Sequence, residues 1–170
     1  MRPKNLLRFA LGLIFLGNFA LAQLKKAPAS QVPQAIIQAC VFEKRISAKD
    51  EISIFVMGDG EIAKTLEMYE KQKLGNSILA NVGVGQKAPS DKPTILILGD
   101  PDLVGQATAY CQENSVLSIT NIPDMVKEGI SLGIGVDEAG SLKLIINPRA
   151  SAKEGNNWNL AIMKLAKIIQ

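Results

Sequence analysis

The amino-acid sequence predicts an α/β fold: a mostly parallel central sheet flanked by helices, with a C-terminal β-hairpin and a closing helix. The clearest signal is the stretch Thr94–Gly99, where four consecutive branched apolar residues stand between turn residues. A strand with one face in water alternates apolar and polar residues, whereas a parallel strand is covered on both faces. A helical pattern at Asp102–Gln112 follows at once, as in the βα half of a βαβ unit.

Residues 1–22 have the pattern of a secretory signal peptide. A basic start precedes an apolar run over residues 9–19, and Ala20-Leu21-Ala22 supplies small residues for a signal peptidase. Cleavage is expected between Ala22 and Gln23. The alternative is an uncleaved membrane anchor, but the apolar run is shorter than the roughly 20 residues needed to span a bilayer. We therefore expect an exported, periplasmic protein that does not span the membrane after cleavage.

The composition excludes several classes of function. The chain of 170 residues contains no histidine and only two cysteines, which rules out Ser-His-Asp and Cys-His catalysis and the usual zinc sites. Three of the 19 basic residues lie in the signal segment, so the rest of the chain is neutral and gives no sign of nucleic-acid binding. The turns Gly58-Asp59-Gly60 and Gly83–Lys87 lack the spacing of phosphate-binding loops. No catalytic residue, cofactor or metal site is expected, and the protein is predicted not to be an enzyme.

A polar lead over residues 23–31, expected to be mobile, precedes a single domain over residues 32–170. The first helix is expected over residues 32–44, with Pro33 in its first turn. The elements expected next are strands over 52–57, 77–84, 94–99 and 116–120, helices over 61–71 and 102–112, and a short helix over 125–128.

The last third of the sequence has the pattern of antiparallel rather than parallel strands. Strands over 131–136 and 142–146, joined by a short loop containing glycine, are predicted to form an antiparallel hairpin. Asn147-Pro148 then has the pattern of a helix start, with Asn as cap and Pro in the first turn. A closing amphipathic helix is expected over residues 158–169, with Trp158 as a core anchor.

Three motifs of this last third are similar to those of a known family. They are Gly129-Ile130-Ser131-Leu132-Gly133, then Leu144–Ala150, then Gly155 followed by Ile162–Ile168. The chain resembles the YfiR-like family of periplasmic regulatory proteins over residues 33–169. The resemblance implies an α/β domain, often a homodimer. Members repress a membrane-bound diguanylate cyclase by binding its periplasmic sensor domain, which places them in cyclic diguanylate signalling and biofilm regulation. The shared motifs look structural, so the resemblance assigns no functional residue.

The first functional hypothesis is therefore a non-enzymatic periplasmic regulator that binds the periplasmic domain of an inner-membrane diguanylate cyclase. The alternative is an exported small-molecule-binding module associated with an outer-membrane uptake system. Its site would lie beyond the carboxyl ends of the parallel strands, near Gly58-Asp59, Gly99-Asp100 and Thr120-Asn121. Because such residues are also ordinary in βα turns, the regulator is preferred.

Cys40 and Cys111 raise the question of a disulfide. An oxidising compartment allows two cysteines to pair, and each lies on an expected helix. The bond requires both helices to be neighbours on one face of the sheet, with Cα atoms within about 7 Å. The alternative is two separate buried thiols.

Overall fold

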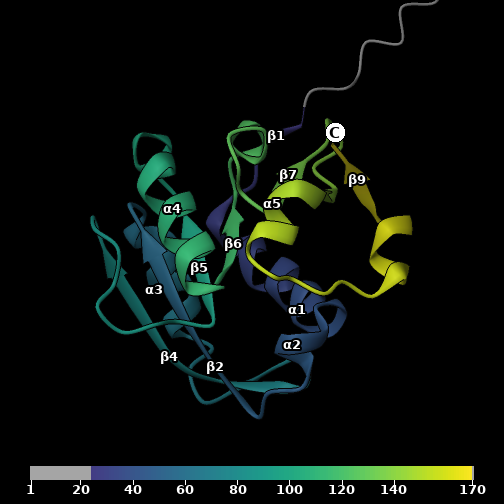
Figure 1. Cartoon of the computed structure of the whole chain (residues 1–170). Helices are drawn as coiled ribbons and strands as arrows, with labels where there is room; N and C mark the ends of the chain where they lie inside the picture. Colours follow the sequence, from purple (N-terminus) through teal and green to yellow (C-terminus); the bar gives the residue numbers. More distant parts are fainter. Residues whose placement is uncertain (1–23, 170) are drawn as a thin grey trace, which may run out of the picture.

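The computed structural model describes residues 24–169, and one nine-stranded sheet organises them. The strands are β1 (Lys25–Lys26), β2 (Glu51–Met57), β3 (Lys73–Leu74), β4 (Ser77–Gly85), β5 (Ile95–Leu98), β6 (Leu117–Thr120), β7 (Leu132–Val136), β8 (Leu142–Ile146) and β9 (Ala166–Ile168). Their order is β3-β4-β2-β5-β6-β7-β8-β9, and β1 pairs with β7 off this path. Figure 1 shows the sheet running from β4 on the left to β9 on the right.

Helices connect and cover these strands. The α-helices are α1 (Val32–Phe42), α2 (Lys44–Ser47), α3 (Gly60–Glu67), α4 (Val104–Asn114) and α5 (Pro148–Lys153). Short 3-10 helices are η1 (Ala29–Gln31), η2 (Pro101–Leu103), η3 (Pro123–Val126) and η4 (Leu160–Lys164).

The centre of the sheet is parallel, as the sequence predicts. Strand β2 pairs in parallel with β4 and β5, β5 with β6, and β6 with β7. All four residues of β5 are fully buried. Ile95 and Ile97 belong to the apolar core of one face, whereas Leu96 and Leu98 belong to that of the other. Coverage on both faces explains why this strand has no polar alternation.

The two faces are covered by different helices. The larger core contains buried residues of α1 and α3, and the smaller core contains Ala107 and Cys111 of α4. The helices α1 and α3 both contact η1 and pack on each other. The sheet is therefore the middle layer of an α/β/α arrangement, which confirms the predicted fold class.

The antiparallel hairpin and the helix that follows it are confirmed. Strand β7 pairs antiparallel with β8 from Leu132↔Ile146 to Val136↔Leu142. Asn147 caps α5, because its side chain accepts a hydrogen bond from the backbone N–H of Ala150 at 3.0 Å. Helix α5 ends before Gly155, which has a φ of +70°, a conformation that glycine adopts without strain.

The expected range of the closing helix requires a correction. Residues 158–169 begin with a bridge between Trp158 and Glu43, continue as the short helix η4, and end as β9. Strand β9 pairs in parallel with β8. The apolar spacing fits a helix, but β8 presents backbone groups that need partners. Pairing with the sheet overrides the local pattern, so only η4 is helical.

The lead expected over residues 23–31 is joined to the domain from Lys25 onward. Strand β1 pairs antiparallel with β7, through Lys25↔Val136 and Lys26↔Gly135. Ala27 is fully buried, and its backbone N–H donates to the carbonyl of Asn121 at 3.0 Å. The expected first helix begins at Val32, directly after η1.

Candidate functional site

The acidic residues at the carboxyl ends of the parallel strands are occupied by structural contacts. Asp59 caps α3, accepting from the N–H groups of Glu61 and Ile62 at 3.0 and 3.1 Å. Its other oxygen lies 3.5 Å from Lys26 Nζ. Asp100 accepts from the N–H of Asp102 at 3.0 Å, which caps η2.

Thr120 and the side-chain N–H of Asn121 are occupied in the same way, whereas the buried Asn121 Oδ1 has no hydrogen-bond partner among the described residues. The Thr120 hydroxyl donates to the Leu98 carbonyl at 2.8 Å, and the Asn121 side-chain N–H donates to the Ala27 carbonyl at 2.8 Å. A pocket of about 280 Å³ remains between Asn121 and the segment from Lys26 to Ala29. The structure thus brings the expected ligand-site residues to one edge, but their polar groups hold turns and the amino-terminal segment.

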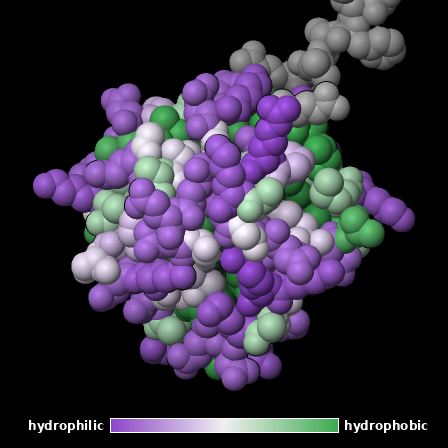
Figure 2. All heavy atoms as spheres, in the orientation of Figure 1, coloured by the Kyte–Doolittle hydropathy of each residue, from purple (hydrophilic) through white to green (hydrophobic). Residues whose placement is uncertain are grey.

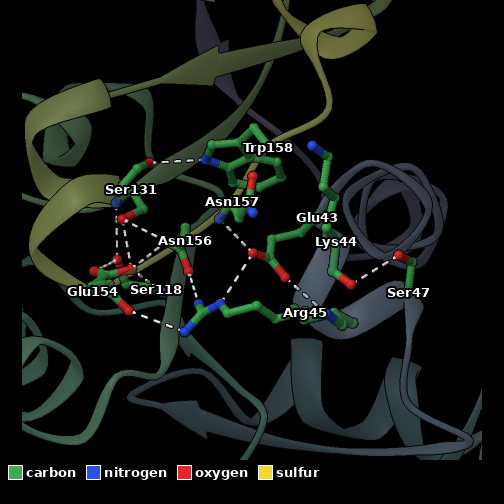
Figure 3. A network of polar contacts seen from close by, with 12 residues as sticks. Glu43, Lys44, Arg45, Ser47, Ser118, Ser131, Glu154, Asn156, Asn157 and Trp158 are labelled. Carbon is green, nitrogen blue, oxygen red and sulfur yellow. Dashed lines mark hydrogen bonds and ion pairs between the residues drawn. The ribbon is translucent and has the colours of Figure 1, made fainter.

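A buried polar network on the opposite side of the fold joins residues far apart in the sequence (Figure 3). Glu43, between α1 and α2, is fully buried. One of its oxygens accepts from the N–H of Asn157 at 2.6 Å, and the other from the N–H of Ile46 at 2.8 Å. The Arg45 Nε lies 3.1 Å from Glu43 Oε1. Glu43 therefore fixes the start of α2 and ties it to the segment after α5.

Glu154 is the second buried carboxylate of this network. It accepts from the Ser118 N–H at 3.0 Å, the Ser118 hydroxyl at 2.5 Å, the Ser131 hydroxyl at 2.5 Å and the Asn156 side chain at 2.9 Å. Burial raises the pKa of the Glu154 carboxyl, and the hydrogen bonds from Ser118, Ser131 and Asn156 oppose that rise. The carboxyl thus joins the end of α5 to strand β6 and to the residue before β7.

Arg45 bridges the two carboxylate sites. Its guanidinium donates to the backbone carbonyl of Glu154 at 3.3 Å and to the side-chain oxygen of Asn156. Figure 3 shows Arg45 reaching from α2 toward Glu154 and Asn156, with Glu43 between α2 and Asn157. The network holds residues 154–158 in place, immediately before η4 and β9.

The pH dependence of stability tests the state of Glu154. Because burial raises its folded-state pKa above the ordinary value of 4.5, the folded protein binds this proton more tightly than the unfolded chain. The free energy of unfolding should therefore fall as the pH rises from about 4.5 through the folded-state pKa. We expect Glu154→Gln to flatten this fall. Denaturant melts of both proteins across that pH range measure the difference, and parallel profiles would contradict the expectation.

Sequence reasoning does not find this network. Glu43, Arg45 and Glu154 are ordinary charged residues in a chain with 21% charged residues. Their partners are backbone groups and small polar residues that local patterns do not mark. The only sequence signal is the position of Glu154 before the helix-breaking Gly155.

Exposed apolar side chains gather over the segment from η4 to β9. Leu160 is 81% exposed and Leu165 is 61% exposed, and Met163 and Ile168 are also exposed. We call these four residues the C-terminal apolar surface. Apolar atoms show on this side of the molecule in Figure 2, over the position of η4 and β9 in Figure 1. Single exposed apolar residues are normal, but a cluster is typical of an interaction surface.

The two cysteines do not meet in the structure. Cys40 lies in the core covered by α1, and Cys111 lies in the core covered by α4, so the sheet separates them. Both are free and buried, and burial raises the pKa of the Cys40 thiol to about 12. The disulfide considered for Cys40 and Cys111 is therefore not present here, because their helices cover opposite faces.

The thiol count of the purified protein tests this arrangement. We expect two alkylatable thiols per chain after denaturation without reductant, because neither cysteine has a partner within reach of a disulfide. Intact-mass measurement after alkylation reads the number directly. A protein that takes up label only after reduction would contradict the structure.

Two further observations concern the part of the chain that the structure describes. No helix within residues 24–169 is long and apolar enough to cross a membrane. The same residues contain no group of three or more Cys, Asp or Glu side chains placed to hold a metal ion. The predicted cleavage site between Ala22 and Gln23 lies outside the described residues.

Fold and sequence together define the class of this protein. It is a mixed α/β domain with a mostly parallel sheet, and a family model described as DUF4154, YfiR/HmsC-like, matches residues 36–167. The chain belongs to the YfiR/HmsC-like family.

A solved structure supports the fold. The crystal structure of a conserved domain protein from Vibrio cholerae O1 biovar eltor is similar with a TM-score of 0.55 at 11% sequence identity. The match covers 87% of this chain and 66% of that protein, so this chain spans slightly less than two thirds of its length. No curated protein sequence is similar enough to match.

Proposed function

We propose that this protein is a non-enzymatic periplasmic regulator that binds and represses the periplasmic sensor domain of an inner-membrane diguanylate cyclase. The observation that carries the proposal is the family match over residues 36–167, because YfiR/HmsC-like proteins are periplasmic regulators in cyclic diguanylate signalling. The secretory pattern of residues 1–22 supports a periplasmic location.

The C-terminal apolar surface is the docking face that we propose for the sensor domain. Its four residues lie within residues 160–168, beside the last strand of the sheet path. Among residues 24–169, the outer edge of β9 pairs with no strand. An open edge flanked by apolar side chains suits a partner that adds a strand or lays an apolar segment against it.

The Glu43–Arg45–Glu154 network supports this use of the surface. It fixes residues 154–158 by contacts to α2, β6 and the residue before β7. Because η4 and β9 follow directly, the apolar residues are presented in a defined arrangement. A preorganised surface loses less conformational entropy when it binds.

A genetic and binding experiment tests the proposal. Deleting the gene should raise cellular cyclic diguanylate and surface attachment, and the wild-type gene should restore both. We expect the double variant Leu160→Glu/Leu165→Glu to fold, because both side chains are exposed, but to fail in restoration. It should also fail to bind the purified periplasmic domain of a cyclase encoded beside it. Light scattering on the same preparation tests the homodimer that the family resemblance implies.

The matched control is Met68→Glu, which introduces a charge at an exposed apolar residue beyond the end of α3. This variant should restore repression and bind the sensor domain as the wild type does. Unchanged cyclic diguanylate after deletion, in a strain with a periplasm-sensing cyclase, would refute the proposed role. Full repression by the double variant would refute the proposed docking face alone.

A further inference from the structure

A basic pocket lies at the amino ends of the parallel strands. It has a volume of about 480 Å³, and its lining includes Arg45, Lys49, Lys92, Thr94 and Ser115. Lys49 precedes β2, Thr94 precedes β5 and Ser115 precedes β6. The pocket is therefore distinct from both the C-terminal apolar surface and the carboxyl ends of the strands.

The charge of this pocket is positive, and two of its three cations have no ion-pair partner within the part of the chain that the structure describes. Its lining contains three cationic side chains and no carboxylate, and the nearby Asp50 and Asp91 are not part of it. Lys49 and Lys92 form no ion pair with any residue of the range 24–169. Because the chain without its signal segment is neutral, this gathering of cations is local.

Arg45 gives the pocket a fixed cation. Its guanidinium is held by Glu43, Asn156 and the carbonyl of Glu154, yet its side chain is 35% exposed. These three contacts use three of the five N–H donors of an arginine, which leaves donors for a ligand. A guanidinium already held in place loses less conformational freedom when it binds an oxyanion.

Two hydroxyl groups add neutral donors. The Thr94 hydroxyl oxygen accepts from the Ser53 N–H at 3.2 Å, so its own proton is available to a ligand. Ser115 is exposed in the left-handed conformation, with a φ of +53°. Cations and hydroxyl donors on one concave surface are the groups that recognise phosphate and carboxylate oxygens.

We propose that this pocket binds a small multivalent oxyanion that carries phosphate or carboxylate groups. Lys49 and Lys92 supply mobile point charges, and Arg45 supplies a positioned fork of donors. The ligand site can be tested apart from the proposed regulatory function, since its two lysines lie outside the C-terminal apolar surface and it needs no partner protein. It shares only Arg45 with the network behind that surface.

Calorimetric titration of the purified mature chain with pyrophosphate and with citrate tests the proposal. At low, matched ionic strength we expect saturable binding of at least one probe with a Kd of about 1 mM or tighter. Pyrophosphate binding without citrate binding assigns phosphate chemistry, and the reverse assigns carboxylate chemistry. The absence of saturable binding by both probes overturns the proposal.

Charge-matched variants locate the site. Lys49→Gln/Lys92→Gln should weaken binding at least about tenfold, a difference of about 1.4 kcal/mol. Lys64→Gln/Lys153→Gln removes the same net charge from exposed lysines outside the pocket and should bind as the wild type does. Both pairs replace exposed side chains, so both variants should fold. Equal weakening in the two double variants shows general electrostatic attraction and overturns the site.

Discussion

Replacing Glu43 by Ala should lower the free energy of unfolding by about 3 kcal/mol. The substitution leaves the backbone N–H of Asn157 without its acceptor, in a region where Glu43 is fully buried. The Ile46 N–H loses its side-chain acceptor and keeps only the 3.1 Å bond to the backbone carbonyl of residue 43. An unsatisfied buried donor costs about 1–3 kcal/mol. The lost Arg45 contact contributes less, because that guanidinium is partly exposed to water.

Denaturant melts of the purified Glu43→Ala variant measure this loss. The control is Glu113→Ala on α4, where the glutamate is exposed. That control should change stability by no more than about 0.5 kcal/mol, as surface substitutions usually do. A Glu43→Ala variant as stable as the control would show that the network adds nothing to the fold.

Replacing Gly99 by Ala should also destabilise the protein strongly, by about 3 kcal/mol, at the upper end of the usual cost of overpacking. A Cβ at residue 99 would lie 2.1 Å from the Cβ of Asp59 and 3.3 Å from its Cα. Because backbone atoms stand behind that contact, rotating the Asp59 side chain does not relieve it. Displacing Asp59 would weaken the cap of α3 and the contact with Lys26.

Gly105→Ala provides the matched control. Gly105 lies in α4, and an added Cβ there meets no atom within 4 Å. Since alanine favours helices over glycine, this variant should be unchanged or more stable by up to about 1 kcal/mol. Thermal melts of the two variants compare the same chemical change at a crowded and at an open position. Equal melting temperatures of the two variants would contradict the close contact between residue 99 and Asp59.

The sequence predicts those parts of the fold that local chemistry determines. The apolar run of β5, the hairpin of β7 and β8, and the Asn147 cap each follow from residues close together in the chain. The end of the chain does not. The spacing of Trp158, Ile162 and Leu165 fits a helix, but the open edge of β8 favours a strand at residues 166–168. That edge exists only once the sheet has formed.

The candidate sites also depend on contacts between distant residues, which the sequence does not reveal. The sequence directs attention to Asp59, Asp100 and Asn121 at the carboxyl ends of the strands, and the structure does bring them together. It cannot show that Ala27 returns to cover Asn121. It also cannot show that Arg45 and Lys92 share a pocket, because that proximity depends on how α2 packs beside the start of β5.

Two contacts between residues far apart in the sequence affect the rate and the order of folding. The Asn157 N–H binds Glu43 across 114 residues, and Asn121 binds Ala27 across 94. Closing such long loops lowers the entropy of the chain before the contacts that stabilise the fold can form. A topology dominated by distant contacts therefore folds slowly. The sheet cannot be completed until β9 joins β8. Slow folding of this kind is compatible with the export that we propose from the pattern of residues 1–22, since a chain must be unfolded to be threaded through a membrane.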